Sequence, residues 1–138
     1  MFGLSPKLPV QRDPSTGFAL TKTYEEMIKQ NLKNLVLTSP GERMMDINFG
    51  VGIRDFLFEP NIQEVYEEID DRIRTQVTTY MPFVEVRRIK FFSGEDISIR
   101  GQIRGRVDAH PNKLHLAIEY FILPLGVLNA LAVSVDLV

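Results

Sequence analysis

The spacing of hydrophobic positions changes once along the chain, and this change predicts the order of the elements. Up to Tyr80 they recur every three or four residues, and from Val84 onward they alternate with polar residues. The first spacing is typical of one face of an α-helix and the second of a half-buried β-strand. The sequence therefore predicts an α+β fold, with two helices packed on a small antiparallel sheet.

Two helices are predicted between residues 24 and 80. The first follows Thr23, which forms a capping box with Glu26, and Pro40-Gly41 ends it. A loop with three glycines is expected over residues 38–53. The second helix follows a cap at Asn61, and its apolar stripe consists of Ile62, Val65, Tyr66, Ile69, Ile73, Val77 and Tyr80.

The remaining segments complete a single domain over residues 1–138. Prolines and glycines recur in residues 1–20, which predicts an extended arm with little structure of its own. The helix–loop–helix segment covers 24–80, and antiparallel strands cover 84–138. A bulge is expected near Arg87-Arg88, where the alternation of the first strand changes phase. Further strands are predicted over 97–107, 114–122 and 131–137.

The last predicted strand is unusual because it carries a single charge, Asp136. Natural edge strands are normally blunted by lysine, proline or a bulge. Such a strand either pairs inside the sheet or accepts a strand from another chain, and the pattern leaves both possibilities open. The candidate strand-pairing residues are Leu131, Val133, Val135 and Leu137.

Composition excludes several classes of function. The net charge of −2 gives no general attraction to nucleic acid or to anionic membrane. No cysteine is present, and two histidines are too few for a histidine-rich metal site, so no metal or cofactor is predicted. The longest apolar stretch, 120–128, is far shorter than the roughly 20 residues of a membrane-spanning helix. No secretion signal is expected either, which favours a soluble protein made in a cytoplasm.

Catalytic patterns in the sequence are weak. A glycosidase needs two carboxyl groups flanking a sugar bond, and the candidates are Glu42, Asp46, Asp55 and Glu59. Their spacing singles out no pair, so loop hydrogen bonds and ion pairs are the favoured interpretation. Gly50-Val51-Gly52 lacks the other residues of a phosphate-binding loop and predicts a tight turn.

A nucleic-acid interface is a further hypothesis. Arg100, Arg104 and Arg106 are expected on one face of a strand, where they could meet phosphates. No aromatic residue interleaves with them, so base stacking is not offered. A solvated face, or one that meets an acidic protein, is the more common outcome.

Residues 24–92 resemble the baseplate wedge family of contractile phage tails, whose relatives include a baseplate component of the type VI secretion system. The strand pattern from Asn112 to Leu137 also fits the C-terminal sheet of that family. The positions that carry the resemblance are Ile28-x-x-x-Leu32-Lys33-Asn34-Leu35-Val36-Leu37-Thr38-x-Pro40-Gly41-Glu42-Arg43 and Asp46-x-x-Phe49-Gly50-x-Gly52-Ile53-Arg54-Asp55-x-Leu57-Phe58-Glu59.

The resemblance implies a structural subunit of the virion, present once per wedge in a sixfold baseplate and assembled in the host bacterial cytoplasm. It would contact the central bundle of wedge proteins, and strands from the first ring of sheath subunits would extend its sheet. Tail tube and hub proteins are further candidate partners. The family has also carried a lysozyme label, which leaves a peptidoglycan-degrading glycosidase as the alternative to a protein without catalysis.

One departure from the family pattern affects the expected wedge contact. Many members have Glu-Pro-Arg after the second helix, where the charged side chains contact the wedge bundle. Here the matching residues are Met81, Pro82 and Phe83. The resemblance therefore implies that this contact is hydrophobic in this chain, or that Arg87 and Arg88 carry it.

Overall fold

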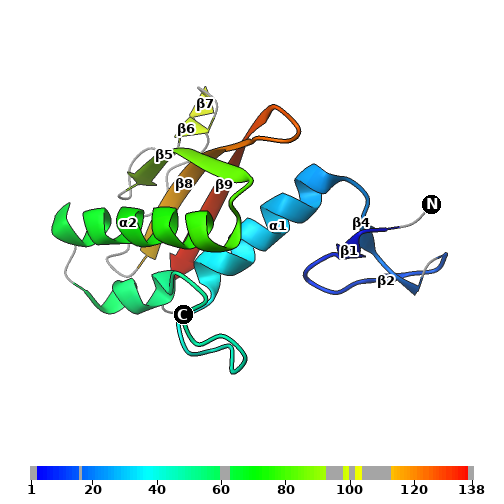
Figure 1. Cartoon of the computed structure of the whole chain (residues 1–138), viewed down its shortest axis with the longest axis horizontal. Coiled ribbons are helices and arrows are strands. Elements are labelled where there is room, and N and C mark those ends of the chain that lie inside the picture. Colours follow the sequence, from blue (N-terminus) through cyan, green and yellow to red (C-terminus); the bar gives the residue numbers. More distant parts are fainter. Residues whose placement is uncertain are drawn as a thin grey trace. The chain divides into compact units, whose positions relative to one another are not determined.

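After the N-terminal arm, the helices come first and a sheet of antiparallel strands follows, as the change in hydrophobic spacing predicts (Figure 1). The computed structural model describes residues 3–15, 17–59, 63–92, 98–99, 102–103 and 113–136. The chain divides into two compact units, Met1–Asn34 and Leu35–Val138. The predicted α+β class is confirmed.

The N-terminal arm is extended, but it has more structure of its own than its prolines predict. Strand β1 (Ser5–Pro6) pairs antiparallel with β4 (Leu20–Thr21), and β2 (Arg12–Asp13) pairs antiparallel with β3 (Gly17–Phe18). The expectation of an arm with little structure is therefore wrong. Proline lacks an N–H group but keeps its carbonyl, so a proline-rich segment can still pair through the residues around each ring.

Side chains hold this arm to its own unit. The Thr21 hydroxyl is buried and lies 2.9 Å from the Ser5 hydroxyl. The side-chain amide of Gln30, on helix α1 (Tyr24–Leu37), accepts a hydrogen bond from Leu8 N–H and donates one to the Pro6 carbonyl. Both contacts join residues far apart in sequence, which local patterns do not reveal.

Helix α1 begins close to the predicted capping box. Glu26 N–H donates to Thr23 Oγ1 at 3.3 Å, which is the first half of the box. The Glu26 carboxylate accepts from Lys22 N–H at 3.3 Å, one residue earlier than predicted. The buried residues of the helix follow the predicted stripe and are Ile28, Leu32, Leu35 and Val36.

The glycines of the following loop allow two close backbone approaches. Gly50 has φ 114°, and a Cβ atom there would lie 2.1 Å from the Thr38 carbonyl oxygen. Gly52 has φ 69° and precedes η1 (Ile53–Phe58), a 3₁₀ helix that the sequence pattern did not predict. Both conformations favour glycine, but residues 50–52 do not form the predicted tight turn, because Val51 N–H and Gly52 N–H donate to the Leu35 and Thr38 carbonyls at the end of α1.

Helix α2 (Gln63–Tyr80) is the longer of the two α-helices and ends before Pro82, as predicted. The predicted cap at Asn61 lies outside the described residues. Ile69, Ile73 and Val77 are buried and form the centre of its apolar face. Among the described residues, no helix combines the length and apolar character needed to cross a membrane.

The main sheet contains β5 (Val84–Phe92), β8 (Lys113–Ile122) and β9 (Val127–Asp136), in the spatial order β5-β8-β9. Its pairing register shifts between Val86 and Arg88, which confirms the predicted bulge. Helix α2 lies along β5 (Figure 1). In β8 and β9 every second residue is buried over much of the strand. The buried residues are Leu116, Ile118, Tyr120, Ile122, Leu131, Val133 and Val135.

One predicted strand is wrong. Residues 97–107 were expected to form a single strand, but β6 (Ser98–Ile99) and β7 (Gln102–Ile103) pair with each other in antiparallel orientation. The chain therefore reverses direction inside the predicted strand. Side chains alternate in the same way along one long strand and along two short paired strands, so periodicity does not distinguish them.

Candidate functional site

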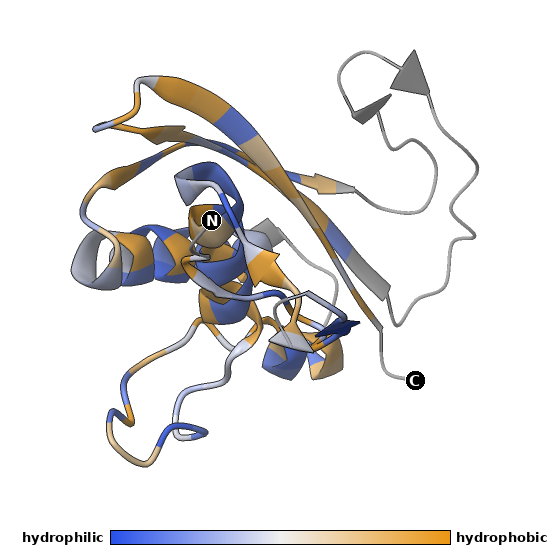
Figure 2. Cartoon of the chain, turned by 90° about the vertical axis from the view of Figure 1, so that its right-hand side faces the viewer, coloured by the Kyte–Doolittle hydropathy of each residue, from blue (hydrophilic) through white to orange (hydrophobic). Residues whose placement is uncertain are grey.

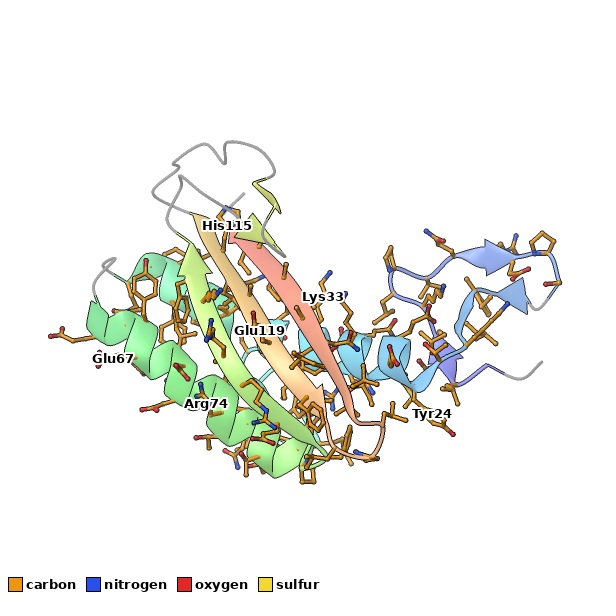
Figure 3. The ribbon with its side chains drawn as sticks, turned by 90° about the horizontal axis from the view of Figure 1, so that it is seen from above. Tyr24, Lys33, Glu67, Arg74, His115 and Glu119 are labelled. Atoms are coloured by element: carbon orange, nitrogen blue, oxygen red, sulfur yellow. The ribbon has the colours of Figure 1, made fainter. Side chains whose placement is uncertain are left out.

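The three-stranded sheet has two outer strands, β5 and β9, with β8 between them (Figure 3). In the part of the chain that the structure describes, β8 is the only strand that pairs with β9. The predicted last strand is therefore an edge strand. Whether it can accept another strand depends on which of its backbone groups turn away from β8.

The direction of the backbone groups in β8 follows from two contacts at its end. Leu123 N–H donates to the Phe83 carbonyl at 3.0 Å, on the β5 side of the sheet. Successive residues of a strand turn their backbone groups to opposite sides, so Ile122 turns toward β9. The Ile122 carbonyl accepts from Gly126 N–H at 2.8 Å in the turn that leads to β9, which agrees with this direction.

The same alternation assigns the backbone groups of β9. Ile118 pairs with Leu131 and Leu116 with Val133, and both β8 residues turn toward β9 as Ile122 does. Leu131 and Val133 therefore turn their N–H and C=O groups toward β8. The intervening residues turn theirs outward, and we call the backbone groups of Ala130, Ala132 and Ser134 the β9 rim.

The side chains of the predicted strand-pairing residues face the core. Leu131, Val133 and Val135 are 3%, 3% and 4% exposed, and Leu137 lies outside the described residues. The sequence singled out the last strand but left its place in the sheet open, and it did not identify the residues that form its rim. A signal for the rim was present in the sequence, since small residues alternate with the apolar residues of this strand. Two of these small residues, Ala132 and Ser134, are exposed in the structure.

The opposite edge of the sheet is partly covered by the chain itself at the start of β5. Val84 N–H donates to the Met81 carbonyl at 3.0 Å. Arg74, on the side of α2 that lies next to β5, donates from its guanidinium to the Val86 carbonyl at 3.1 Å (Figure 3). The bulge follows at once, and the strand carries the charges of Glu85, Arg87, Arg88 and Lys90.

The predicted wedge-contact residues are only partly accessible. Met81 is 6% exposed and belongs to the core, whereas Phe83 is 37% exposed and Pro82 is exposed. Arg87 pairs with Glu85 at 3.2 Å, and its guanidinium lies 5.3 Å from the Phe121 ring centre. Arg88 is exposed on the same strand.

A groove of about 470 Å³ adjoins this region, between α2 and the start of β5. Pro82, Val84 and Leu123 form part of its apolar wall, and Arg74 and Glu85 are the charged residues that line it. Leu123 is 52% exposed, and its N–H group is bonded to Phe83. We call Pro82, Phe83 and Leu123 the apolar end of the sheet. The sequence pattern did not single out Leu123, which stands beside Pro124.

The glycosidase candidates do not line this groove. Glu42, Asp55 and Glu59 are exposed. The Asp46 carboxylate accepts hydrogen bonds from the Tyr80 hydroxyl at 2.8 Å and from Asn48 N–H at 3.1 Å. Asp46 therefore has the loop-stabilising role that its sequence context favoured.

Nucleic-acid binding and metal binding gain no support from the described residues. Arg100, Arg104 and Arg106 lie outside them, so the predicted basic face is not tested. His115 is half-buried on β8. In the described ranges, no group of three or more histidine, aspartate and glutamate side chains could hold a metal ion.

Comparisons with known proteins give one family and a shared fold. The family model of baseplate wedge protein gp25 matches residues 22–123. No curated protein sequence matches the chain. A Geobacter sulfurreducens protein named a tail lysozyme is 22% identical, with a TM-score of 0.65 over 87% of this chain and 96% of that chain. A chain of the anti-feeding prophage baseplate is 24% identical, with a TM-score of 0.62 over 86% of this chain and 83% of that chain.

Proposed function

The chain belongs to the baseplate wedge protein gp25 family, and from this premise we propose that it starts sheath assembly through the β9 rim. As a member of that family it is a structural component of a tail baseplate and assembles with other baseplate proteins. In the proposed step, a strand of a sheath subunit pairs with β9 and extends the sheet. The protein acts by shape and main-chain pairing, without catalysis.

The observation that carries the proposal is the difference between the side chains and the backbone of β9. Leu131, Val133 and Val135 anchor the strand in the core, so its conformation is held before any partner arrives. Ala132 and Ser134 place small exposed side chains beside the outward backbone groups. Strand addition derives its affinity from main-chain hydrogen bonds, and small neighbouring side chains leave room for the incoming strand.

The apolar end of the sheet is the proposed contact with the wedge bundle. Family members with Glu-Pro-Arg at this place present charges, whereas this chain presents Pro82 and Phe83 beside Leu123. Burial of exposed apolar side chains stabilises an interface by roughly 25 cal/mol per Å² of apolar area. We therefore expect a hydrophobic wedge contact, with Arg87 and Arg88 at its polar margin and one copy of the chain in each of six wedges.

Ala132→Pro tests the rim. Proline removes the outward N–H of Ala132, while the bonds between β8 and β9 use the neighbouring residues. The variant should enter baseplates but nucleate far fewer full-length sheaths, counted in electron micrographs of assembled tails. Ala132→Val keeps the N–H group and serves as the control. Normal sheath formation by a folded Ala132→Pro variant would show that this rim accepts no strand.

Phe83→Ser combined with Leu123→Ser tests the apolar end. The double variant should join baseplates poorly, measured as the amount of this subunit in purified baseplates at equal expression. Phe18→Ser is the control, because Phe18 is 53% exposed and lies in the other unit. Equal incorporation of both variants would exclude the apolar end as a wedge contact.

A further inference from the structure

The loop between α1 and η1 presents two methionines to solvent. Met44 is 92% exposed and Met45 is 99% exposed, and Ile47 beside them is 65% exposed. The loop protrudes, and hydrophobic positions recur along its outer end (Figure 2). We call Met44 and Met45 the methionine tip. Large apolar side chains gathered on an ordered protrusion are typical of an interaction site.

We propose that the methionine tip inserts into an apolar pocket of a neighbouring baseplate protein. This inference rests on the proposed place of the chain in a baseplate, but it concerns a surface separate from the β9 rim and from the apolar end. The pocket belongs to the partner, and the tip is the part that fills it.

The base of the loop is held by hydrogen bonds, so the tip is presented in a defined position. Gly41 N–H donates to the Ile47 carbonyl at 2.9 Å and closes the loop behind the tip. The side-chain amide of Gln76, on α2, accepts from Gly50 N–H and donates to the Asn48 carbonyl, each at 3.0 Å. A loop held in this way loses little further conformational entropy when it binds.

Aromatic contacts support the same base. The rings of Phe49 and Tyr80 meet edge to face with centres 4.9 Å apart, and the Arg43 guanidinium lies 3.8 Å from the Phe49 ring centre. The hydrogen bond from the Tyr80 hydroxyl to Asp46 raises the pKa of Tyr80 above its usual 10.0, and desolvation adds to this. This contact stabilises the folded loop below pH 10, and the stabilisation is lost as pH rises through the raised pKa.

The charges next to the tip determine which partner fits. Asp46 is bonded to Tyr80 and Arg43 is stacked on Phe49, but Arg43 is exposed and keeps its positive charge. Glu42 remains exposed beside the tip. Glu42 and Asp46 exceed Arg43 by one charge, so the loop has no net positive charge to attract anionic lipid or nucleic acid, and an uncharged protein pocket is the matching surface. Methionine suits such a pocket because its flexible thioether adapts to irregular shapes.

Oxidation of methionine provides a direct test on the intact tail. Free subunit and purified tails are treated with dilute hydrogen peroxide, and sulfoxide at each methionine is measured by mass spectrometry. Met44 and Met45 should oxidise rapidly in the free subunit and at least tenfold more slowly in tails. Met81, which is 6% exposed, is the internal reference and should be protected in both samples.

Substitution of the tip tests its contribution to assembly. Met44→Ser combined with Met45→Ser should weaken incorporation into baseplates by about tenfold for each methionine, the effect of losing one buried apolar side chain. Asn48→Ala alters the same loop outside the tip and is the control. The free energy of unfolding, measured by urea denaturation, should be unchanged in the double variant if the base of the loop is intact.

Three results would overturn the inference. Equal oxidation in free subunit and tails would show that nothing covers the tip. Protection in the free subunit that disappears on dilution would identify a second copy as the occupant. Protection by phosphatidylglycerol vesicles would identify a lipid surface. The two proposals can fail separately. If the tip is oxidised in tails while Ala132→Pro still reduces sheath formation, only the proposed role of the methionine tip is contradicted. If the tip is protected in tails while Ala132→Pro forms normal sheaths, only the proposed sheath contact is contradicted.

Discussion

The two edges of the sheet differ in the properties that control strand pairing. Over β5 the pairing is interrupted by a bulge, four residues are charged, and the Val84 N–H and the Val86 carbonyl are bonded within the chain. Over β9 the register with β8 is regular from end to end, and Asp136 is the one charged residue. The chain blunts one edge with several devices at once and leaves the other regular.

This difference shows that edge protection is selective in this fold. Bulges, charges and covering side chains are the usual means by which proteins prevent pairing between sheet edges. Strand β5 has a bulge, charged residues and a covering side chain. The fold can therefore protect a sheet edge, and the regularity of β9 is specific to that edge. An edge that stays regular and carries a single charge beside a protected one has the properties of a template for another strand.

The largest effect is expected within β9 itself. Val133→Pro removes a bond of the β8–β9 ladder and disturbs a core position, so it should lower the free energy of unfolding by about 3 kcal/mol. Ala132→Pro should lower it by about 1 kcal/mol or less, because its N–H group turns outward. Urea denaturation measures both. Similar losses in the two variants would show that the assignment of outward groups is wrong.

Removing the cover of β5 should have a smaller effect. Arg74→Met leaves the Val86 carbonyl without its donor and should cost about 1 kcal/mol, because the guanidinium is partly exposed to solvent. Arg72→Met is the control, since Arg72 forms a similar helix ion pair with Glu68 but no bond to a strand. If both variants lose the same stability in urea, Arg74 does not protect the edge.

Adding a charge to the open edge should change assembly more than stability. Ala132→Glu should alter the free energy of unfolding by no more than about 0.5 kcal/mol, because the position is exposed. It should nevertheless reduce sheath nucleation, as edge charges do. Ala117→Glu is the matched control, because Ala117 pairs with Ala132 but lies on the central strand. Equal sheath yields from both variants would argue against pairing at β9.

The smallest effect on stability is expected for the ion pair of β5. Glu85 and Arg87 are about half-exposed, so Glu85→Gln with Arg87→Gln should change the free energy of unfolding by less than about 0.5 kcal/mol. The charges are expected to matter for edge protection instead. Sedimentation of the variant should still show no added self-association, because the bulge and Arg74 remain. Strong self-association would show that charge alone protects this edge.

Local patterns predicted most of the elements. The helix stripes, the stop at Pro82 and the bulge beside Arg87 each depend on residues close in sequence, and each is found in the structure. Errors occurred where an outcome depends on distant partners or where the pattern fits two arrangements. The arm gains structure from Thr21 and Gln30, and residues 97–107 turn back where periodicity allowed one strand.

Sequence alone determined that the chain has two amphipathic helices, a glycine-marked loop and a weakly charged last strand, because side-chain periodicity and turn residues act locally. Tertiary structure decided that Leu131 and Val133 face the core, that Ala132 and Ser134 carry the open rim, and that Arg74 covers the Val86 carbonyl at the opposite edge. The physical reason is that strand order, and the side to which each backbone group turns, arise only when distant segments pair.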